Sequence, residues 1–183
     1  VADGPLRRSS IYDGEIYDAR KEITGWDEPG FNDSSWENTK TRNYSFENIV
    51  HTVNEPVRKH EELKPIEIFL SPEGDTIVDF GQNLVGWVRM RTAGQQGDTI
   101  TLSHAEVLDK EGNFYTENLR GAKQQNVYVL KGEEQVFEPG FSWQGFRYLK
   151  VEGLGRMPAE DDMTAIVLYS DMNLTGEFHT SNQ

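Results

Sequence analysis

The residues best placed for acid–base chemistry are a histidine and a glutamate two positions apart. His104 and Glu106 belong to a stretch, residues 99–108, in which side chains alternate as in a β-strand. Alternation puts both side chains on one face, about 7 Å apart, where a proton could be exchanged. Ile100 and Leu102 share that face. We therefore expect a partly buried structural His–Glu pair in preference to a catalytic one.

The other catalytic patterns fail on composition or spacing. There is no cysteine, which excludes thiol nucleophiles, cysteine-bound zinc and iron–sulfur clusters. Residues 140–145 (GFSWQG) look like a nucleophile elbow, but the second glycine comes one position too late and no strand–turn–helix pattern surrounds Ser142. The four histidines have no metal-binding spacing, and no phosphate- or dinucleotide-binding glycine motif occurs. We predict no catalytic residue and no metal site.

One loop offers oxygen atoms of the kind that a hard cation accepts. Asp109, Glu111 and Asn113 alternate around Gly112, and calcium loops use carboxylate and amide oxygens in this way. The remaining ligands of a helix–loop–helix calcium site are missing, and Asp, Asn and Gly are also the usual residues of a hairpin turn. A turn is the expected role. We expect no cofactor, with calcium as the weaker alternative.

Aromatic residues are prominent, at 11% of a chain with 36% hydrophobic residues. Aromatic side chains fill β-sheet cores, and their flat faces also suit stacking on sugar rings. A core position is expected for four that follow strand periodicity: Trp87, Phe141, Phe146 and Tyr148. Trp26, Trp36 and Trp143 follow no such period. These three are the candidates for contact with carbohydrate or with a neighbouring domain.

The charge of the chain argues against two classes of partner. Eighteen basic and 31 acidic residues give a net charge of −13, which repels the phosphate backbone of nucleic acids and anionic membrane surfaces. No apolar run approaches the ~20 residues that a membrane helix needs, and no signal-peptide core is present. We expect neither nucleic acid nor a membrane as a partner.

The elements that must position these residues are β-strands. From residue 66 to residue 168, short apolar or alternating runs are separated by turn residues roughly every 8–12 positions, and no stretch has three turns of helical periodicity. Residues 81–83 interrupt one run as a bulge or bend, at which Asn83 can bond to local backbone. The predicted fold class is all-β, an antiparallel β-sandwich or jelly roll.

Six motifs in the right order resemble a known family. Residues 77–88 (IVDFGQNLVGWV) look like the VDFGQN-hydrophobic-x-GW signature of bacterial α-L-rhamnosidases. The motifs that follow in register are HAEVL (104–108), GNFYTENLR (112–120), YVLKG (128–132), FEPGF (137–141) and GFRY (145–148). Residues 11–20 and 25–36 resemble the end of the N-terminal β domain of that family. The resemblance covers nearly the whole chain.

The resemblance implies a fragment of a bacterial glycoside hydrolase. In that family, concanavalin-like β-sandwich domains precede an (α/α)6 barrel that holds the catalytic carboxylates and works by inversion. On that basis residues 1–44 are predicted as the tail of a preceding N-terminal β domain plus a connecting loop, and 45–174 as the β-sandwich accessory domain. Residues 175–183 are predicted as the start of the linker into the barrel. The sequence does not predict the cellular compartment. The resemblance implies that the parent protein is periplasmic or secreted.

Two functions follow for the chain itself. The first is a non-catalytic accessory domain that supports the catalytic barrel of the same parent chain, so that this chain alone hydrolyses nothing. The alternative is a carbohydrate-binding module that recognises rhamnose-containing glycans through exposed aromatics. A broad apolar patch near residues 176–183 would favour the first function, and an exposed Trp with a nearby Asp or Asn the second.

Overall fold

The computed structural model describes residues 4–181, which form ten β-strands and three short 3-10 helices. The strands are β1 (Leu6–Ser10), β2 (Gly14–Asp18), β3 (Val57–Leu63), β4 (Glu67–Leu70), β5 (Thr76–Thr92), β6 (Thr99–Ala105), β7 (Gln125–Val129), β8 (Gln135–Phe137), β9 (Gln144–Glu152) and β10 (Met163–Ser170). The 3-10 helices are η1 (Ala19–Lys21), η2 (Glu117–Leu119) and η3 (Glu160–Asp162). Within residues 4–181, no helix has the length and hydropathy needed to cross a membrane.

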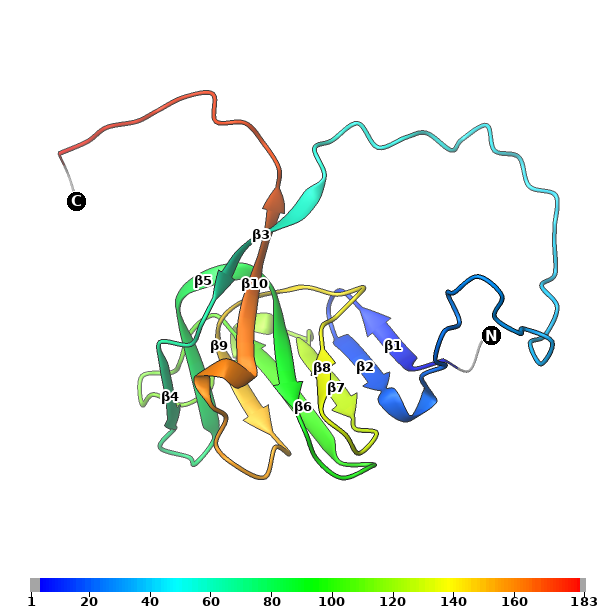
Figure 1. Ribbon diagram of the computed structural model, residues 1–183. Helices are drawn as coiled ribbons and strands as arrows, with labels where there is room; N and C mark the ends of the chain where they lie inside the picture. The colour runs from blue at the N-terminus through cyan, green and yellow to red at the C-terminus, as the bar shows by residue number, and fades with distance from the viewer. Residues whose placement is uncertain (1–3, 182–183) are drawn as a thin grey trace.

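The strands form one sheet that curls around a shared core (Figure 1). Neighbours follow the order β1-β2-β7-β6-β9-β5-β10-β3, and β4 and β8 also pair with β5. The predicted all-β fold class is confirmed. One pair departs from the antiparallel rule, because β2 runs parallel to β7 and so joins the β1–β2 hairpin to the rest of the sheet.

β5 is the longest strand and bends near its middle. Gly81 has a φ of +82°, which L side chains rarely adopt, and the pairing of β5 with β9 shifts register between Asp79 and Leu84. Before the bend β5 pairs with β4, and after it with β8 and β10. The predicted bulge is confirmed. Asp79, not Asn83, supplies the side-chain acceptor there, since its Oδ1 accepts a hydrogen bond from the Gly81 N–H at 2.6 Å.

The core lies between the inner faces of the curled sheet. Phe146 packs edge-on against Phe80 with ring centroids 5.8 Å apart, and Tyr128 stacks on Phe137 with centroids 4.5 Å apart. Offset and edge-on ring pairs of this kind add to the stability gained from burying apolar area.

The prediction that four aromatics face the core is confirmed fully for one of them. Phe146 is completely buried, while Trp87 and Tyr148 are half-buried. Phe141 was predicted wrongly, because 69% of it is exposed. It lies in the loop between β8 and β9, where the side chains do not alternate between two faces of a sheet.

Two long segments lie outside the sheet. Residues 22–56 connect η1 to β3, residues 171–181 follow β10, and most of their side chains are exposed. The segment 22–56 leaves the sheet after η1 and returns to it at the start of β3, beside the end of β10, from which residues 171–181 extend away (Figure 1). The chain therefore enters β3 and leaves β10 at the same end of the sheet.

The domain boundaries predicted at residues 44 and 174 stay predictions. The first predicted segment starts in residues 1–3, and the last ends in residues 182–183, both of which lie outside the described part of the chain.

Candidate functional site

A hollow of about 770 Å³ lies beside the start of β3, the middle of β5 and the end of β10, and the loop between β8 and β9 forms one of its walls. Its lining consists of Val57, Arg58, Lys59, Val85, Trp87, Gly140, Phe141, Ser142, Trp143, Leu168, Tyr169 and Ser170. A volume of this size is typical of sites that hold a small ligand or an inserted side chain of a partner.

Strand pairing brings together lining residues that are far apart in the sequence. In the antiparallel pair of β3 and β10, Val57 faces Ser170 and Arg58 faces Tyr169. Tyr169 is held by a second contact, since its ring stacks on that of His60 with centroids 3.7 Å apart. The paired strands β3 and β10 thus form the floor of the hollow, and stacking on His60 orients the Tyr169 ring.

The two cations that line the hollow each have a carboxylate partner. Lys59 forms an ion pair with Glu138 and lies 5.4 Å from the centre of the Trp87 ring, and the indole N–H of Trp87 donates to the same Glu138 carboxylate at 2.9 Å. Arg58 lies 3.1 Å from a carboxylate oxygen of Asp171. Because these charges are matched in pairs, the hollow is chiefly an aromatic and aliphatic surface with a neutralised polar rim.

The hollow contains one of the three tryptophans predicted to contact carbohydrate or a neighbouring domain. Trp143 is 49% exposed and lines it together with Trp87. Trp26 and Trp36 are exposed in the segment 22–56, where the Trp36 ring lies 5.5 Å from that of Phe31. The structure does not bring these two into the lining, and the sugar-binding role of all three stays a prediction.

Sequence reasoning missed Trp87 and Phe141 as lining residues, because it assigned both to the core. A signal for Phe141 was present in the sequence, since it follows Pro139 and Gly140, which favour a loop over a strand. No comparable signal marks Trp87, whose partial exposure depends on which strands cover β5.

The predicted His104–Glu106 pair is not formed. His104 is fully buried, and its Nδ1 lies 2.8 Å from the carbonyl oxygen of Gln124. Its ring also packs edge-on against Phe146, with centroids 4.9 Å apart. Glu106 is exposed, because β6 ends at Ala105 and the next residue leaves the pleat. The arrangement provides no acid–base couple at this place.

Arg147 pairs with a carboxylate at the bend of β5. Its Nε and Nη2 each lie 2.8 Å from one oxygen of Asp79. Burial acts to raise the pKa of Asp79, but hydrogen bonds from Arg147 and from the Gly81 amide, with the charge of Arg147, outweigh burial and hold that pKa below its usual value. The pair fastens the bend of β5 to β9.

Two of the three side chains considered for calcium, those of Asp109 and Asn113, accept hydrogen bonds from backbone amides. The Asp109 carboxylate accepts hydrogen bonds from the backbone N–H groups of Asn113 at 2.7 Å and Glu111 at 3.0 Å, and the bond from Asn113 is the main reason why its pKa is lowered. The side-chain oxygen of Asn113 accepts from the Glu73 N–H at 3.1 Å. Within residues 4–181, no three His, Asp or Glu side chains gather as metal ligands would.

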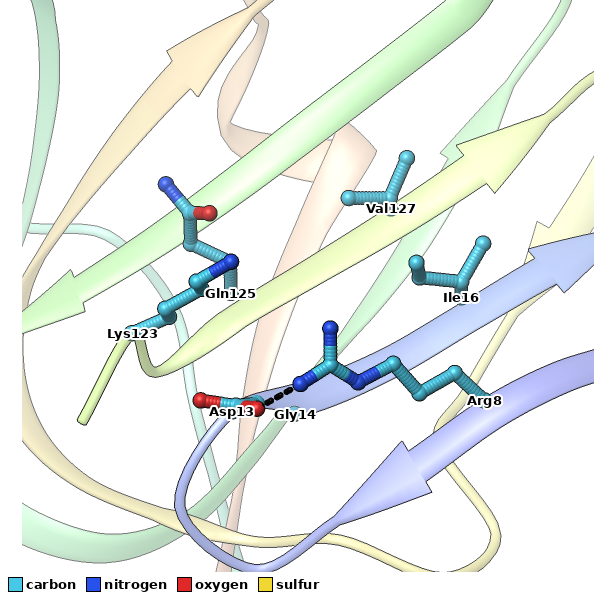
Figure 2. A pocket seen from close by; sticks show the side chains of 7 residues that line it. All are labelled: Arg8, Asp13, Gly14, Ile16, Lys123, Gln125 and Val127. Atoms are coloured by element: carbon cyan, nitrogen blue, oxygen red, sulfur yellow. Dashed lines mark hydrogen bonds and ion pairs between the residues drawn. The ribbon is translucent and has the colours of Figure 1, made fainter.

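A second, much smaller hollow of about 70 Å³ lies over β2 and β7 (Figure 2). Figure 2 shows the Arg8 side chain extending to Asp13, with which it forms an ion pair across the hollow. Ile16 and Val127, paired in register on β2 and β7, supply its apolar part. Ligand sites commonly enclose about 300 Å³ or more, so this hollow is too small for a sugar ring.

Comparisons with known proteins match nearly the whole length of the chain. Residues 70–169 match the family model of the bacterial α-L-rhamnosidase concanavalin-like domain, and residues 1–61 match that of the α-L-rhamnosidase N-terminal domain. The chain is 41% identical over 183 residues to an α-L-rhamnosidase of Streptomyces avermitilis and 34% identical over 184 residues to one of Alteromonas sp. (strain LOR). These alignments cover 99% and 98% of the chain but 18% and 20% of the relatives.

Solved structures give the same picture. The native α-L-rhamnosidase of Aspergillus terreus superposes with a TM-score of 0.91 at 43% identity, over 99% of this chain and 21% of that one. The Streptomyces avermitilis α-L-rhamnosidase complexed with L-rhamnose superposes with a TM-score of 0.90 at 41% identity, over 98% of this chain and 18% of that one. The chain spans about a fifth of the length of the relatives that it matches.

Proposed function

The chain belongs to the family of bacterial α-L-rhamnosidases, and from that premise we propose that it is a non-catalytic β-sandwich accessory domain of a larger enzyme. In this proposal the parent enzyme hydrolyses α-L-rhamnosides with inversion, in an (α/α)6 domain of the same polypeptide. The chain described here packs against that domain and supports it, and by itself hydrolyses nothing.

The observation that carries the proposal is the open, mainly apolar hollow. Phe141 and Trp143 are exposed on its wall. Exposed apolar surface that gathers in one place usually marks an interaction site. The segment that follows β10 exposes three further apolar side chains, those of Met172, Leu174 and Phe178. Cores of interfaces are rich in aromatic residues and poor in unpaired charge, which matches this lining.

The path of the chain supports a covalently attached partner. Ser170, the last residue of β10, lines the hollow, and the chain continues outward from it. Anything attached after residue 183 is therefore tethered close to the hollow, at an effective concentration that short linkers raise to the millimolar range. A weak intrinsic affinity suffices for docking under these conditions.

A lysine scan of two matched valines tests the proposal. Val85 lines the hollow and is 49% exposed, whereas Val136 on β8 is 55% exposed and does not line it. In the isolated chain both Val85→Lys and Val136→Lys are expected to change stability by less than about 0.5 kcal/mol. In the parent enzyme, Val85→Lys is expected to lower Tm and the hydrolysis of a chromogenic α-L-rhamnoside, and Val136→Lys to leave both unchanged. Equal behaviour of the two variants in the parent enzyme would reject docking at the hollow.

The alternative is a carbohydrate-binding module, and the half-exposed Trp143 beside Trp87 favours it. A calorimetric titration of the chain with L-rhamnose and with a rhamnosylated glycan, each with and without calcium, separates the two functions. Saturable binding that Trp143→Ala abolishes would assign a sugar site to the hollow, and abolition by Trp26→Ala or Trp36→Ala would assign it to the segment 22–56. If no heat of binding is measured at millimolar sugar, the carbohydrate-binding function is rejected and only the accessory function remains.

A further inference from the structure

Glu15 is a buried carboxylate that the site described above does not explain. It is the second residue of β2, in the segment that matches the N-terminal domain model, and only 3% of it is exposed. Its own N–H donates to the side-chain oxygen of Asn126 on β7 at 3.0 Å, which fixes the backbone of β2 at this point. A buried carboxylate is costly unless donors surround it, so its partners indicate its role.

The donors to Glu15 come from three successive residues on the wall of the hollow. Its Oε2 accepts hydrogen bonds from the backbone N–H groups of Phe141 at 2.9 Å and Gly140 at 3.0 Å, and from the Ser142 hydroxyl at 3.2 Å. A fourth contact joins the same two parts of the chain, because the Ser9 hydroxyl donates to the Phe141 carbonyl at 3.3 Å. More than 120 residues of sequence separate Glu15 from this loop.

We infer that Glu15 is a positioning residue: it holds the loop 138–143 in the conformation that presents Phe141 and Trp143 to the hollow. The loop lies between β8 and β9 and has no strand pairing of its own. The backbone N–H groups of Gly140 and Phe141 therefore depend on Glu15 for a hydrogen-bond acceptor. The backbone that Glu15 holds in place sets the positions of the exposed Phe141 and Trp143 rings. A surface ordered in advance binds its partner at a smaller entropic cost.

Through the hydrogen bonds of Glu15 and Ser9, the β1–β2 hairpin helps to form the wall of the hollow. The inference rests on the proposed function in one respect, namely that the hollow is a binding surface. It adds that β2, in the segment matching the N-terminal domain model, holds a loop of the segment matching the concanavalin-like model. Since coupling between two sites is reciprocal, a partner seated in the hollow should also protect the hairpin from local opening.

Amide hydrogen exchange in the isolated chain tests the inference, with Glu15→Gln as the perturbation and Asp18→Asn as the matched control. Asp18 lies on the same strand and is also a buried carboxylate, but its partner is Arg20. Glu15→Gln removes the negative charge that strengthens the hydrogen bonds from the loop and leaves only one oxygen to accept them. It is expected to raise exchange at Gly140 and Phe141 at least tenfold over Asp18→Asn, while β9 amides such as that of Leu149 keep their protection.

Two results would overturn the inference: unchanged exchange at Gly140 and Phe141 in Glu15→Gln, or an increase that spreads equally to the β9 amides. Should Glu15→Gln fail to fold, Ser142→Ala removes only the hydroxyl donor, and Ser71→Ala is its control as a second buried serine with a turn hydrogen bond. Ser142→Ala must then raise amide exchange in the loop, and Ser71→Ala must not.

The outcome is separable from that of the proposed function. If the loop amides exchange faster in Glu15→Gln but the parent enzyme carrying this substitution keeps its Tm and activity, positioning by Glu15 stands and docking at the hollow fails. If the loop amides stay protected in Glu15→Gln, while Val85→Lys destabilises the parent enzyme and Val136→Lys does not, the inference fails and docking stands.

Discussion

His104 makes the stability of the chain depend on pH in one direction. In the neutral ring, the Nδ1–H donates to the Gln124 carbonyl, while Nε2 has no hydrogen-bond partner among the described residues. A second proton would therefore sit on a buried nitrogen without an acceptor. Burial lowers the pKa of His104 to about 4, although the hydrogen bond to Gln124 acts in the opposite direction.

The size of the effect follows from the difference between the folded and unfolded pKa values. In the unfolded chain His104 regains a pKa of about 6.5, so the unfolded state takes up the proton first as the pH falls. The stability associated with the neutral ring is complete above about pH 6.5 and is lost as the pH falls towards 4. One pKa unit corresponds to about 1.4 kcal/mol, so at pH 5.0 the loss is about 2 kcal/mol.

Urea unfolding at pH 7.5 and pH 5.0, followed by tryptophan fluorescence, measures this loss. The wild-type chain is compared with His104→Asn, whose side-chain amide can still donate towards Gln124 but does not titrate. Between the two pH values, the wild type is expected to lose about 2 kcal/mol more free energy of unfolding than His104→Asn. The exposed His51 is the control, and His51→Asn should keep the full loss. Equal losses in the wild type and His104→Asn would refute the reasoning.

The remaining predictions concern packing in the isolated chain. A Cβ added at Gly86 would lie 1.9 Å from the Ile166 carbonyl oxygen, whereas one added at Gly140 meets nothing within 4 Å. Gly86→Ala is thus expected to lower the free energy of unfolding by about 3 kcal/mol or more and Gly140→Ala by less than about 0.5 kcal/mol, and similar urea midpoints would contradict this. Phe146→Ala should cost roughly 3–5 kcal/mol, because the ring is fully buried, and Phe141→Ala less than about 1 kcal/mol. A comparable loss for both would show that Phe141 packs in the core after all.

Local sequence patterns were sufficient for the elements of the fold. The alternation in residues 77–80 and 84–90 predicted a strand, and the glycine at position 81 predicted its interruption, because only glycine adopts the observed φ of +82° without strain. The need of Arg147 for a carboxylate was also predictable from charge alone. Its partner was not, because Asp79 lies 68 residues away and only the register of β5 against β9 brings the two together.

Errors arose where a strand was shorter than the local pattern indicated. Glu106 would share a face with His104 if β6 continued, but the strand ends at Ala105. Phe141 would alternate into the core if β9 began before Gln144, but a loop precedes it. Element ends depend on which neighbours remain available for pairing, and periodicity contains no information about that.

The sequence by itself determined the fold class, the family and the absence of a recognisable catalytic motif, because these depend on periodicity, motif order and composition along the chain. Only the tertiary structure decided where a surface forms. The hollow needs the start of β3, the middle of β5 and the end of β10 side by side, and a loop held by Glu15 from the first hairpin. Each of these contacts joins residues that are distant in the chain, and their proximity is a product of strand order and register in the folded sheet.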